Sequence, residues 1–390
     1  GWYSVSDEAF YNEDEIEEID GKKISISSKS TVEWIEEESY FFRLSKWEKP
    51  LLDFYEKNPN FISPESRKNE VISFVKSGLK DLSVSRKTFS WGIQVPGNEN
   101  HVIYVWLDAL TNYISALNYP NKEDKLFKKF WPASLHLIGK DILRFHAVYW
   151  PAFLLAANIE LPKKVYGHGW ILSGDEKMSK SKGNILDPLQ IIDEYGLDPL
   201  RYYLIKEVSF GNDGNISQER LEDCINSDLA NNYGNLCQRV TTFAIKNCNG
   251  KIPVKIKFEK DDLKILNKFK DNLEKIRSEI DQQNLNFYIN YIVNSLFEAN
   301  KYFNDQEPWK KKEDIIRLNT IVFTSLEIIR KISFLLYPII PSSALKALKI
   351  FNLNENDIKL EDVSKNELLV KGNTINKIDI LFKKIEKNND

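Results

Sequence analysis

The sequence predicts an α/β domain followed by an all-α helix bundle, from two contrasts along its 390 residues. Between about residues 90 and 172, short β-rich runs alternate with helix-like stretches, which is typical of βαβ units and a parallel sheet. From about residue 187 onward, apolar residues recur at spacings of three and four, as in an antiparallel bundle. With 42% hydrophobic and 28% charged residues, the chain should fold into two or three packed units.

Three β-rich runs and two helix-like stretches make up the predicted α/β part. The runs are HVIYVW (101–106), SLHLIG (134–139) and KKVYGHGWIL (163–172), and the helix-like stretches cover 107–117 and 141–157. Ligands of such sheets bind at the carboxyl ends of the strands. Candidate site residues are therefore expected in 106–113, 140–146 and 173–184.

Four long stretches of helical periodicity make up the predicted bundle. They cover residues 217–247, 261–280, 285–303 and 313–337. Strand signals are scarce among them, and no fixed repeat is evident. The first 86 residues have the pattern of a solvated accessory subdomain, and no activity can be assigned to the tail beyond residue 351.

Composition limits the class of protein. A net charge of -3 means that a nucleic acid would have to be bound by local basic surface, so an RNA partner is neither supported nor excluded. The three cysteines, Cys224, Cys237 and Cys248, lack metal-ligand spacing and fit a reducing compartment. No apolar run is long enough for a membrane span. Because the chain opens Gly1-Trp2-Tyr3 without an initiator Met, we expect a segment before it.

The most informative segment is GDEKMSKSKGN (174–184). A Lys/Ser-rich loop is usually only solvated, but KMSKS arises by chance about once in ten thousand chains of this length. It also follows a predicted strand. The segment resembles the signature loop of class I aminoacyl-tRNA synthetases, and the extended KMSKSKGN followed by Asp187-Pro188 is similar to the subgroup that handles Met, Leu, Ile, Val and Cys.

This resemblance implies that the loop binds ATP, which enters the reaction with Mg²⁺. Negative charge grows on ATP when a carboxylate attacks its α-phosphorus, and ammonium groups on a loop with glycine hinges can stabilise that charge. Lys180 is expected to do this, with Lys177 assisting. The further ATP-binding residues of the loop would be Met178, Ser179 and Ser181.

Two other segments resemble methionyl-tRNA synthetases more than their relatives: YVWLDALTNY (104–113) and IGKDILRFHAVYWPAFL (138–154). An apolar, polarizable thioether suits a pocket of aromatic rings with a neutral His. Taken singly, each such residue is more often part of a core. Together in these segments, the resemblance implies a methionine pocket lined by Trp106, Ala109, Tyr113, Ile142 and His146.

Further ATP contacts are implied by the same resemblance. The segment VYGHGW (165–170) is similar to the strand that meets adenine, with His168 and Gly169 as contacts, because glycine permits close approach of a base to the backbone. Asp141 would help to hold the nucleotide, and Arg86 would act near the reacting groups. A surface ion pair is the alternative for Asp141 and for Arg86.

In the bundle, Asn235 and Arg239 are four residues apart and share a helix face. With Trp309 they resemble the anticodon-reading residues of methionyl-tRNA synthetases. An exposed Trp can stack on a base while Asn and Arg read its edges. The alternative is a buried interhelical Trp with an Arg on the helix surface.

The implied fold is the second half of a class I Rossmann domain with its connective-peptide insertion, followed by an anticodon-binding bundle. The expected divisions are 1–86 (connective peptide), 87–172 (Rossmann half), 173–215 (KMSKS loop and stem contacts), 216–350 (bundle) and 351–390 (a segment packing back on the body). The family's His-Ile-Gly-His type motif is not found, so this chain alone is expected to be incomplete for catalysis.

Many relatives in the family carry a zinc knuckle that begins where this chain has Ser4 and Asp7. We therefore expect no structural zinc. The implied activity is ligation of methionine to tRNA-Met, by a monomer in the cytoplasm or an organellar matrix. Two alternatives remain: a non-catalytic tRNA-binding module, and a synthetase of the same subgroup for another amino acid.

Overall fold

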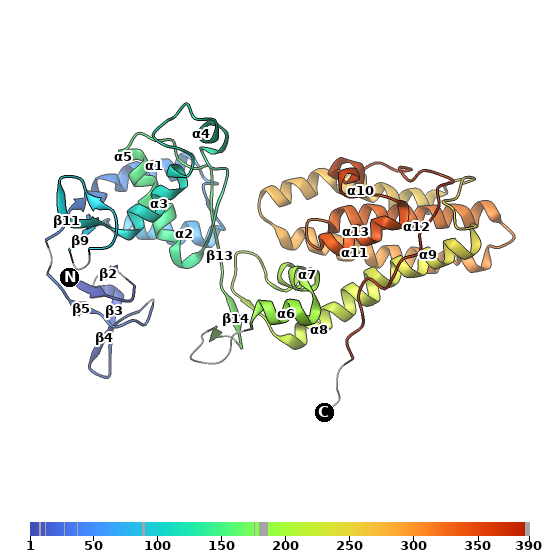
Figure 1. Ribbon diagram of the computed structural model, residues 1–390, viewed down its shortest axis with the longest axis horizontal. Helices are drawn as coiled ribbons and strands as arrows, with labels where there is room; N and C mark the ends of the chain where they lie inside the picture. Colours follow the sequence, from blue (N-terminus) through green and yellow to red (C-terminus); the bar gives the residue numbers. More distant parts are fainter. Residues whose placement is uncertain are drawn as a thin grey trace. The chain divides into compact units, whose positions relative to one another are not determined.

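The computed structural model describes residues 1–7, 9–11, 13–26, 28–36, 38–87, 90–174, 176–178 and 186–386. Contacts divide the chain into two compact units, Gly1–Gly167 and His168–Asp390. Figure 1 shows strands and short helices in the first unit and long helices in the second. The predicted succession of an α/β part and an all-α part is confirmed.

The first unit begins with small antiparallel sheets. One has the strand order β2 (Ala9–Tyr11), β1 (Trp2–Ser4), β5 (Glu33–Trp34), and β3 (Ile16–Ile19) pairs with β4 (Lys22–Ser25). Strand β6 (Phe41–Phe42) pairs with β8 (Leu82–Ser83). These short strands therefore lie outside the parallel sheet.

The parallel pairing predicted for the α/β part is found around β13. Its sheet has the order β12 (His136–Gly139), β13 (Val165–His168), β7 (Ile62–Ser63), and β13 runs parallel to β7. Helices α1 (Glu48–Lys57) and α2 (Glu65–Lys76) flank β7 in the chain. Their side chains share one buried cluster with residues 138–165, so residues 44–79 pack with this sheet.

The strand predicted at 101–106 is wrong in two respects. Strand β11 covers Asn98–Ile103 and pairs antiparallel with β10 (Gln94–Val95) and β9 (Ser85–Arg86), so it is not part of a parallel sheet. Helix α3 (Val105–Ser115) begins before the predicted strand ends. Val105 and Trp106 are apolar in either structure, so the run of apolar residues could not reveal the boundary.

The predicted helix at 141–157 is a composite. A 3₁₀ turn, η3 (Lys140–Ile142), is followed by a π-helical turn, η4 (Phe145–Tyr149), and then by α5 (Trp150–Ala156). Helix α4 (Lys125–Phe130) precedes β12. Single π-turns inside helices often occur at functional sites.

The second unit opens with a small sheet of order β15 (Glu176–Lys177), β14 (Ile171–Ser173), β16 (Gly214–Asn215). The predicted strand 163–172 is thus divided at Gly169 and Trp170 between two sheets. Helix α6 (Pro188–Tyr195) starts where Asp187 accepts a hydrogen bond from Leu189 N–H and Pro188 occupies the first turn. Helix α7 (Leu197–Glu207) follows.

The predicted helical stretches of the bundle are all found. They are α8 (Gln218–Cys224), the π-helix η6 (Ile225–Gly234), α9 (Asn235–Asn247), α10 (Lys260–Asp281), α11 (Leu285–Asp305) and α12 (Ile315–Leu336). Helix α13 (Pro341–Leu348) and the 3₁₀ turns η7 (Pro308–Lys310), η8 (Lys349–Phe351), η9 (Glu355–Asp357) and η10 (Leu360–Val363) complete the unit. Helices α9, α10, α11 and α13 all contact α12 (Figure 1).

Helix α12 is the central element of the bundle. Residues from Leu318 to Leu336 are almost all buried, as expected for a helix surrounded by others. Its Arg317 donates from two nitrogens to the buried carboxylate of Asp262 on α10, at 2.6 and 3.0 Å. Tyr302 on α11 also donates to Asp262. This buried cluster joins three helices.

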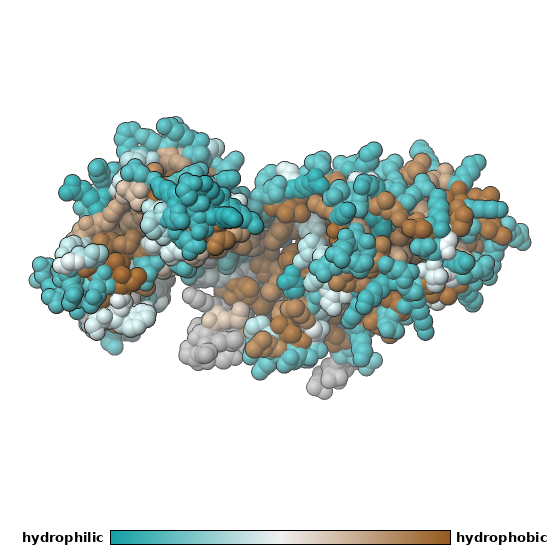
Figure 2. Space-filling model, turned by 45° about the horizontal axis from the view of Figure 1, so that its top comes forward, coloured by the Kyte–Doolittle hydropathy of each residue, from teal (hydrophilic) through white to brown (hydrophobic). Residues whose placement is uncertain are grey.

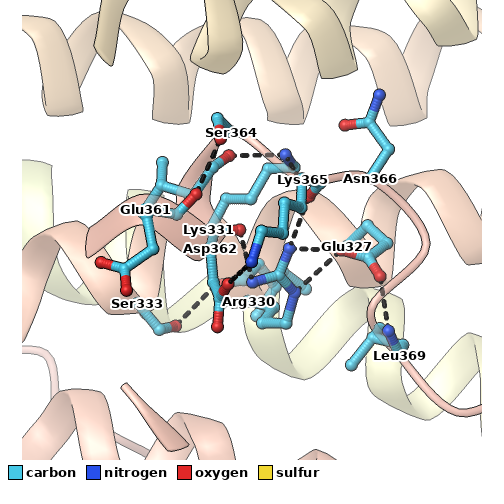
Figure 3. Close-up of polar contacts among 12 residues, drawn as sticks. Glu327, Arg330, Lys331, Ser333, Glu361, Asp362, Ser364, Lys365, Asn366 and Leu369 are labelled. Carbon is cyan, nitrogen blue, oxygen red and sulfur yellow. Dashed lines mark hydrogen bonds and ion pairs between the residues drawn. The ribbon is translucent and has the colours of Figure 1, made fainter. Parts of the chain in front are cut away.

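The C-terminal segment packs on α12 through buried charge (Figure 3). Arg330 donates to Glu327 and to the carbonyl oxygens of Asp362 and Lys365, and Glu327 accepts from the Leu369 N–H at 2.6 Å. Lys331 donates to the carbonyl oxygens of Val363 and Lys365 at 2.6 and 2.8 Å. The segment is therefore bound to the bundle by its backbone.

Candidate functional site

A cluster of aromatic rings with two buried imidazoles lies in the first unit. Tyr113 on α3 donates its hydroxyl hydrogen to Nε2 of His146 at 2.9 Å, and Nδ1 of His146 donates to the Ile142 carbonyl oxygen at 3.0 Å. Burial lowers the pKa of His146, although the Ile142 hydrogen bond acts in the opposite direction. His146 is therefore neutral, with its tautomer fixed by the two hydrogen bonds.

Aromatic rings surround this hydrogen-bonded pair. Trp106 stacks on Phe145 with ring centroids 3.8 Å apart, and its ring lies edge-on to His146 at 6.3 Å. Tyr113 lies 4.2 Å from the ring of His136. Phe145 and His146 are consecutive residues of the π-turn η4, and the rings of both contact Trp106. The result is a half-buried apolar site with one polar pair at its edge.

Four of the five predicted methionine-pocket residues are brought together by contacts. Trp106, Tyr113, Ile142 and His146 are joined by the ring contacts and hydrogen bonds above. Ala109 lies on α3 one turn before Tyr113 and is exposed.

The nucleotide residues predicted in the first unit lie in different surroundings. Arg86 is buried, donates to Ser83 Oγ and the Ser85 carbonyl oxygen, and places its guanidinium over the Tyr104 ring at 4.6 Å. It is therefore not the surface ion pair of the alternative interpretation. Asp141, in η3, is exposed.

In the second unit, Gly169 allows a close approach by this chain's own backbone. A Cβ atom at Gly169 would lie 2.2 Å from the backbone of Asn212, so no larger residue fits there. His168 stacks with Phe210 at 6.3 Å, and its Nδ1 lies 2.8 Å from the Gly169 carbonyl oxygen. The space that a side chain would occupy at Gly169 is therefore filled by this chain's own backbone, and the approach of an adenine base to Gly169 stays a prediction.

Of the signature loop, the structure describes only the beginning. The backbone of Lys177 pairs with Leu172 in the β14–β15 hairpin, and Met178 packs against the core of the second unit. Ser179, Lys180 and Ser181 lie outside the described residues.

A groove of about 450 Å³ lies on the bundle between α9 and the turn η7. Its lining combines aromatic, amide and basic side chains and comprises Gln238, Arg239, Thr242, Phe243, Lys246, Asn247, Phe303 and Trp309. Trp309 is 40% exposed, so it is not the buried interhelical Trp of the alternative interpretation. Figure 2 shows hydrophobic and hydrophilic residues side by side on the visible face of the bundle.

Arg239 is held in this groove by two contacts. Its Nη2 donates to Asn304 Oδ1 at 2.7 Å, and its guanidinium lies 5.8 Å from the Phe303 ring centroid. Phe303 in turn lies edge-on to Trp309 at 6.2 Å. Asn235 lies one turn before Arg239 on α9 and is not among the lining residues, so the groove brings together two of the three predicted residues.

Comparison with known proteins gives the same assignment in both halves of the chain. A family model described as "tRNA synthetases class I (M)" matches residues 12–241, and one described as "Anticodon binding domain of methionyl tRNA ligase" matches residues 252–390. A methionine–tRNA ligase of Brucella suis is 50% identical over 365 residues, which are 93% of this chain and 70% of the relative. The chain belongs to the methionyl-tRNA synthetase family.

Other members of the methionyl-tRNA synthetase family are equally similar. A methionine–tRNA ligase of Rickettsia felis is 49% identical over 393 residues, covering 99% of this chain and 75% of the relative. The Mycobacterium tuberculosis methionyl-tRNA synthetase in complex with methionyl-adenylate superposes with a TM-score of 0.94 at 43% identity. It covers 98% of this chain and 76% of that one. The class I synthetase fold predicted from the sequence is confirmed.

Ser4 and Asp7, the positions at which a zinc knuckle was expected to begin in relatives, belong here to a cluster of hydroxyl groups. Asp7 accepts hydrogen bonds from Tyr11 at 2.8 Å, Ser28 at 2.5 Å and Ser30, and Ser4 donates to Ser30. Although burial alone would raise it, these hydroxyls hold the pKa of Asp7 below its usual value. No group of three His, Cys, Asp or Glu side chains suited to a metal occurs among the residues described.

Sequence reasoning missed several residues of these sites. Phe145 is adjacent to His146, and His136 follows a predicted strand start, but nothing in the sequence shows which rings face Tyr113. Phe303 and Asn304 precede Trp309 by six and five residues. This short distance in the chain is the only feature of the sequence that connects them with the groove. Their positions follow from packing between helices, which a single sequence does not show.

Proposed function

We propose that this protein is a methionine–tRNA ligase that activates L-methionine with ATP and transfers it to tRNA-Met. Membership of the methionyl-tRNA synthetase family supports this proposal. The observation that carries it is the hydrogen bond from Tyr113 to neutral His146 at the edge of an aromatic pocket. A neutral polar pair beside aromatic rings suits a thioether and offers nothing to a charged side chain.

Methionine recognition by this pocket follows from its chemistry. The methionine chain would lie against the Trp106 ring, and its sulfur would lie near the Tyr113–His146 pair. Leucine, isoleucine and valine lack the polarizable sulfur that this pair would contact, and cysteine is too short to fill the pocket. Discrimination against these four amino acids would therefore depend both on how well the side chain fills the pocket and on weak polar contacts to the methionine sulfur.

The proposed chemical step is attack of the methionine carboxylate on the α-phosphorus of Mg-ATP, which releases pyrophosphate. We assign charge stabilisation to Lys180, assisted by Lys177. Asp141, His168, Gly169, Met178, Ser179 and Ser181 would hold the nucleotide, and Arg86 would act near the reacting groups. The anticodon of tRNA-Met would be read by Asn235, Arg239 and Trp309.

The test is amino-acid-dependent pyrophosphate exchange by the full-length protein with methionine, leucine, isoleucine, valine and cysteine. Exchange with methionine alone is expected. Exchange with another of these amino acids instead would show that the protein is a synthetase of the same subgroup for that amino acid. Specific binding of the tRNA-Met anticodon arm without any exchange would favour the tRNA-binding module instead.

Tyr113→Phe is expected to raise KM for methionine in this exchange by about tenfold or more, because the buried Nε2 of His146 loses its donor. The matched control is Tyr119→Phe, which lies beyond the end of α3. If KM for methionine is unchanged in Tyr113→Phe, the hydrogen bond between Tyr113 and His146 does not contribute to methionine binding.

Lys180→Ala is expected to lower the exchange rate by about a hundredfold or more while methionine affinity changes little, because the charge of Lys180 is used in the transition state. The rate constant and KM are measured together. A fall in the rate constant accompanied by an equally large rise in KM would contradict a role of Lys180 in the transition state alone.

We further propose that the protein acts as a monomer in a reducing cytoplasm. Its three cysteines are free thiols, and burial raises the pKa of Cys224 to about 12 and of Cys248 to about 11. In the described part of the chain, no helix is long and apolar enough to cross a membrane. Light scattering tests the monomer, and metal analysis of purified protein tests the predicted absence of zinc.

A further inference from the structure

The groove on the bundle extends beyond the residues that read a single base. Its lining on α9 runs from Gln238 to Asn247, which at 1.5 Å per residue is about 13 Å along the helix axis. Stacked nucleotides are about 3.4 Å apart. Arg239 lies near the start of this length, and Phe243, Lys246 and Asn247 follow it along α9. Trp309 joins the lining through its contact with Phe303.

The second part of the groove has the chemistry of a nucleotide site. Phe243 is half-buried and lies edge-on to Phe303 with ring centroids 5.8 Å apart. Asn247 donates its Nδ2 hydrogen to the Phe243 carbonyl oxygen at 2.9 Å, which fixes the side-chain amide. Two basic residues and no acidic residue line the whole groove, so its charge favours a phosphate.

Lys246 is the cation best suited to that phosphate. Its side chain is exposed, and within the described ranges no carboxylate lies within ion-pair distance of it. Arg239, in contrast, already contacts Asn304 and Phe303. A lysine is a compact charge on a flexible stem, and it binds a phosphate without requiring one fixed geometry.

We propose that Phe243, Lys246 and Asn247 bind the nucleotide next to the one that stacks on Trp309, and that Lys246 pairs with the phosphate joining the two. This inference rests on the proposed reading of the tRNA anticodon at Arg239 and Trp309. It assigns to Lys246 an affinity role that is independent of base sequence, because a phosphate contact positions the RNA without identifying its bases.

The test uses the full-length protein and a synthetic anticodon stem-loop of tRNA-Met, with Kd measured over a range of salt concentrations. Lys246→Met is expected to weaken binding by about fivefold and to reduce the salt slope by about 0.7, the value for one phosphate contact in a single strand. The loss is expected to be equal for loops with altered anticodon bases. Lys246→Arg should restore the slope. Lys270→Met, an exposed lysine on α10, is the matched control.

A second stem-loop carries one uncharged methylphosphonate at the phosphate between the nucleotide that stacks on Trp309 and its neighbour. It should bind the wild-type protein as weakly as the normal loop binds Lys246→Met, and combining both changes should cause no further loss. Additive losses, or an unchanged salt slope in Lys246→Met, would overturn the inference. If Trp309→Ala also fails to weaken binding of the normal loop, the proposed anticodon site itself is wrong.

Discussion

His136 and His146 lie close together among aromatic rings, with their ring centroids 6.0 Å apart. Burial and, to a smaller extent, the neighbouring His146 together lower the pKa of His136 to about 4. A positive charge on either ring would have no carboxylate to pair with in the surrounding aromatic contacts. Both imidazoles are therefore kept neutral, which suits a pocket for an uncharged side chain.

This burial predicts a pH dependence of stability. The unfolded chain has an ordinary His136 pKa of 6.5 and the folded chain one of about 4, so the unfolded state binds more protons between these values. The free energy of unfolding should therefore fall as the pH drops from about 6.5 to 4 and should be insensitive to His136 above 6.5. His136→Gln should flatten this fall. Urea unfolding across that range measures it, and parallel curves for both proteins would contradict it.

Only those pocket residues that lie in recognisable sequence motifs could be predicted from the sequence. Trp106, Tyr113 and His146 lie in segments that resemble the family, and their contacts are found. His136 contributes as closely to the Tyr113 ring, at 4.2 Å, yet it lies in a short β-rich run without any distinguishing pattern. Which face of such a strand meets a helix depends on tertiary packing, which the alternation of four residues does not determine.

At the scale of elements, long helices were predictable and short strands were not. Helices α10, α11 and α12 differ from the predicted ranges by only a few residues at their ends, because their three-four apolar spacing is sustained over many turns. Strand β7 has two residues and was not predicted, although it pairs with β13. Its residues Ile62 and Ser63 give too short a pattern to distinguish a strand from a loop.

The buried charges of α12 were also not predictable, since Glu327, Arg330 and Lys331 resemble an exposed helical face in sequence. Glu327 is fully buried and accepts from Arg330 and from the Leu369 N–H. Burial and, to a smaller extent, the adjacent Arg330 lower the pKa of Lys331 to about 7, although Glu327 acts in the opposite direction. Glu327 is thus the carboxylate that balances the charge of this cluster.

Glu327→Gln is expected to lower the free energy of unfolding of the bundle by about 3–5 kcal/mol, because it leaves buried Arg330 without its counter-charge. Lys365→Met removes a solvent-exposed lysine that pairs with Asp362 in the same segment, and it should have a much smaller effect, because solvent screens such a pair. Denaturant unfolding of both variants measures the difference. Equal effects would show that the buried carboxylate contributes no more than a surface one.

At the scale of the whole molecule, the two proposed recognition sites belong to different compact units. The aromatic pocket is contained in residues 1–167, and the groove with Trp309 in residues 168–390. The two units have separate hydrophobic clusters. A substitution at one site should therefore not change binding or catalysis at the other site.

Trp309→Ala tests this separation. Aminoacylation of tRNA-Met should fall by about tenfold to a hundredfold, since stacking of one base contributes about 1–3 kcal/mol, while methionine-dependent pyrophosphate exchange should not change. Phe297→Ala, an exposed aromatic residue of α11 that does not line the groove, is the matched control and should affect neither assay. A parallel loss of exchange in Trp309→Ala would give Trp309 a structural role.

The π-turn η4 makes the pocket depend on the number of residues in the chain. An α-helix advances by about 100° per residue, so the extra residue in this turn rotates the preceding backbone by about that angle relative to α5. Deleting Ala147, Val148 or Tyr149 would keep Ile142 and His146 but would turn both by about this angle relative to α5. Two chains with identical pocket residues could thus differ in methionine binding through the length of this one turn.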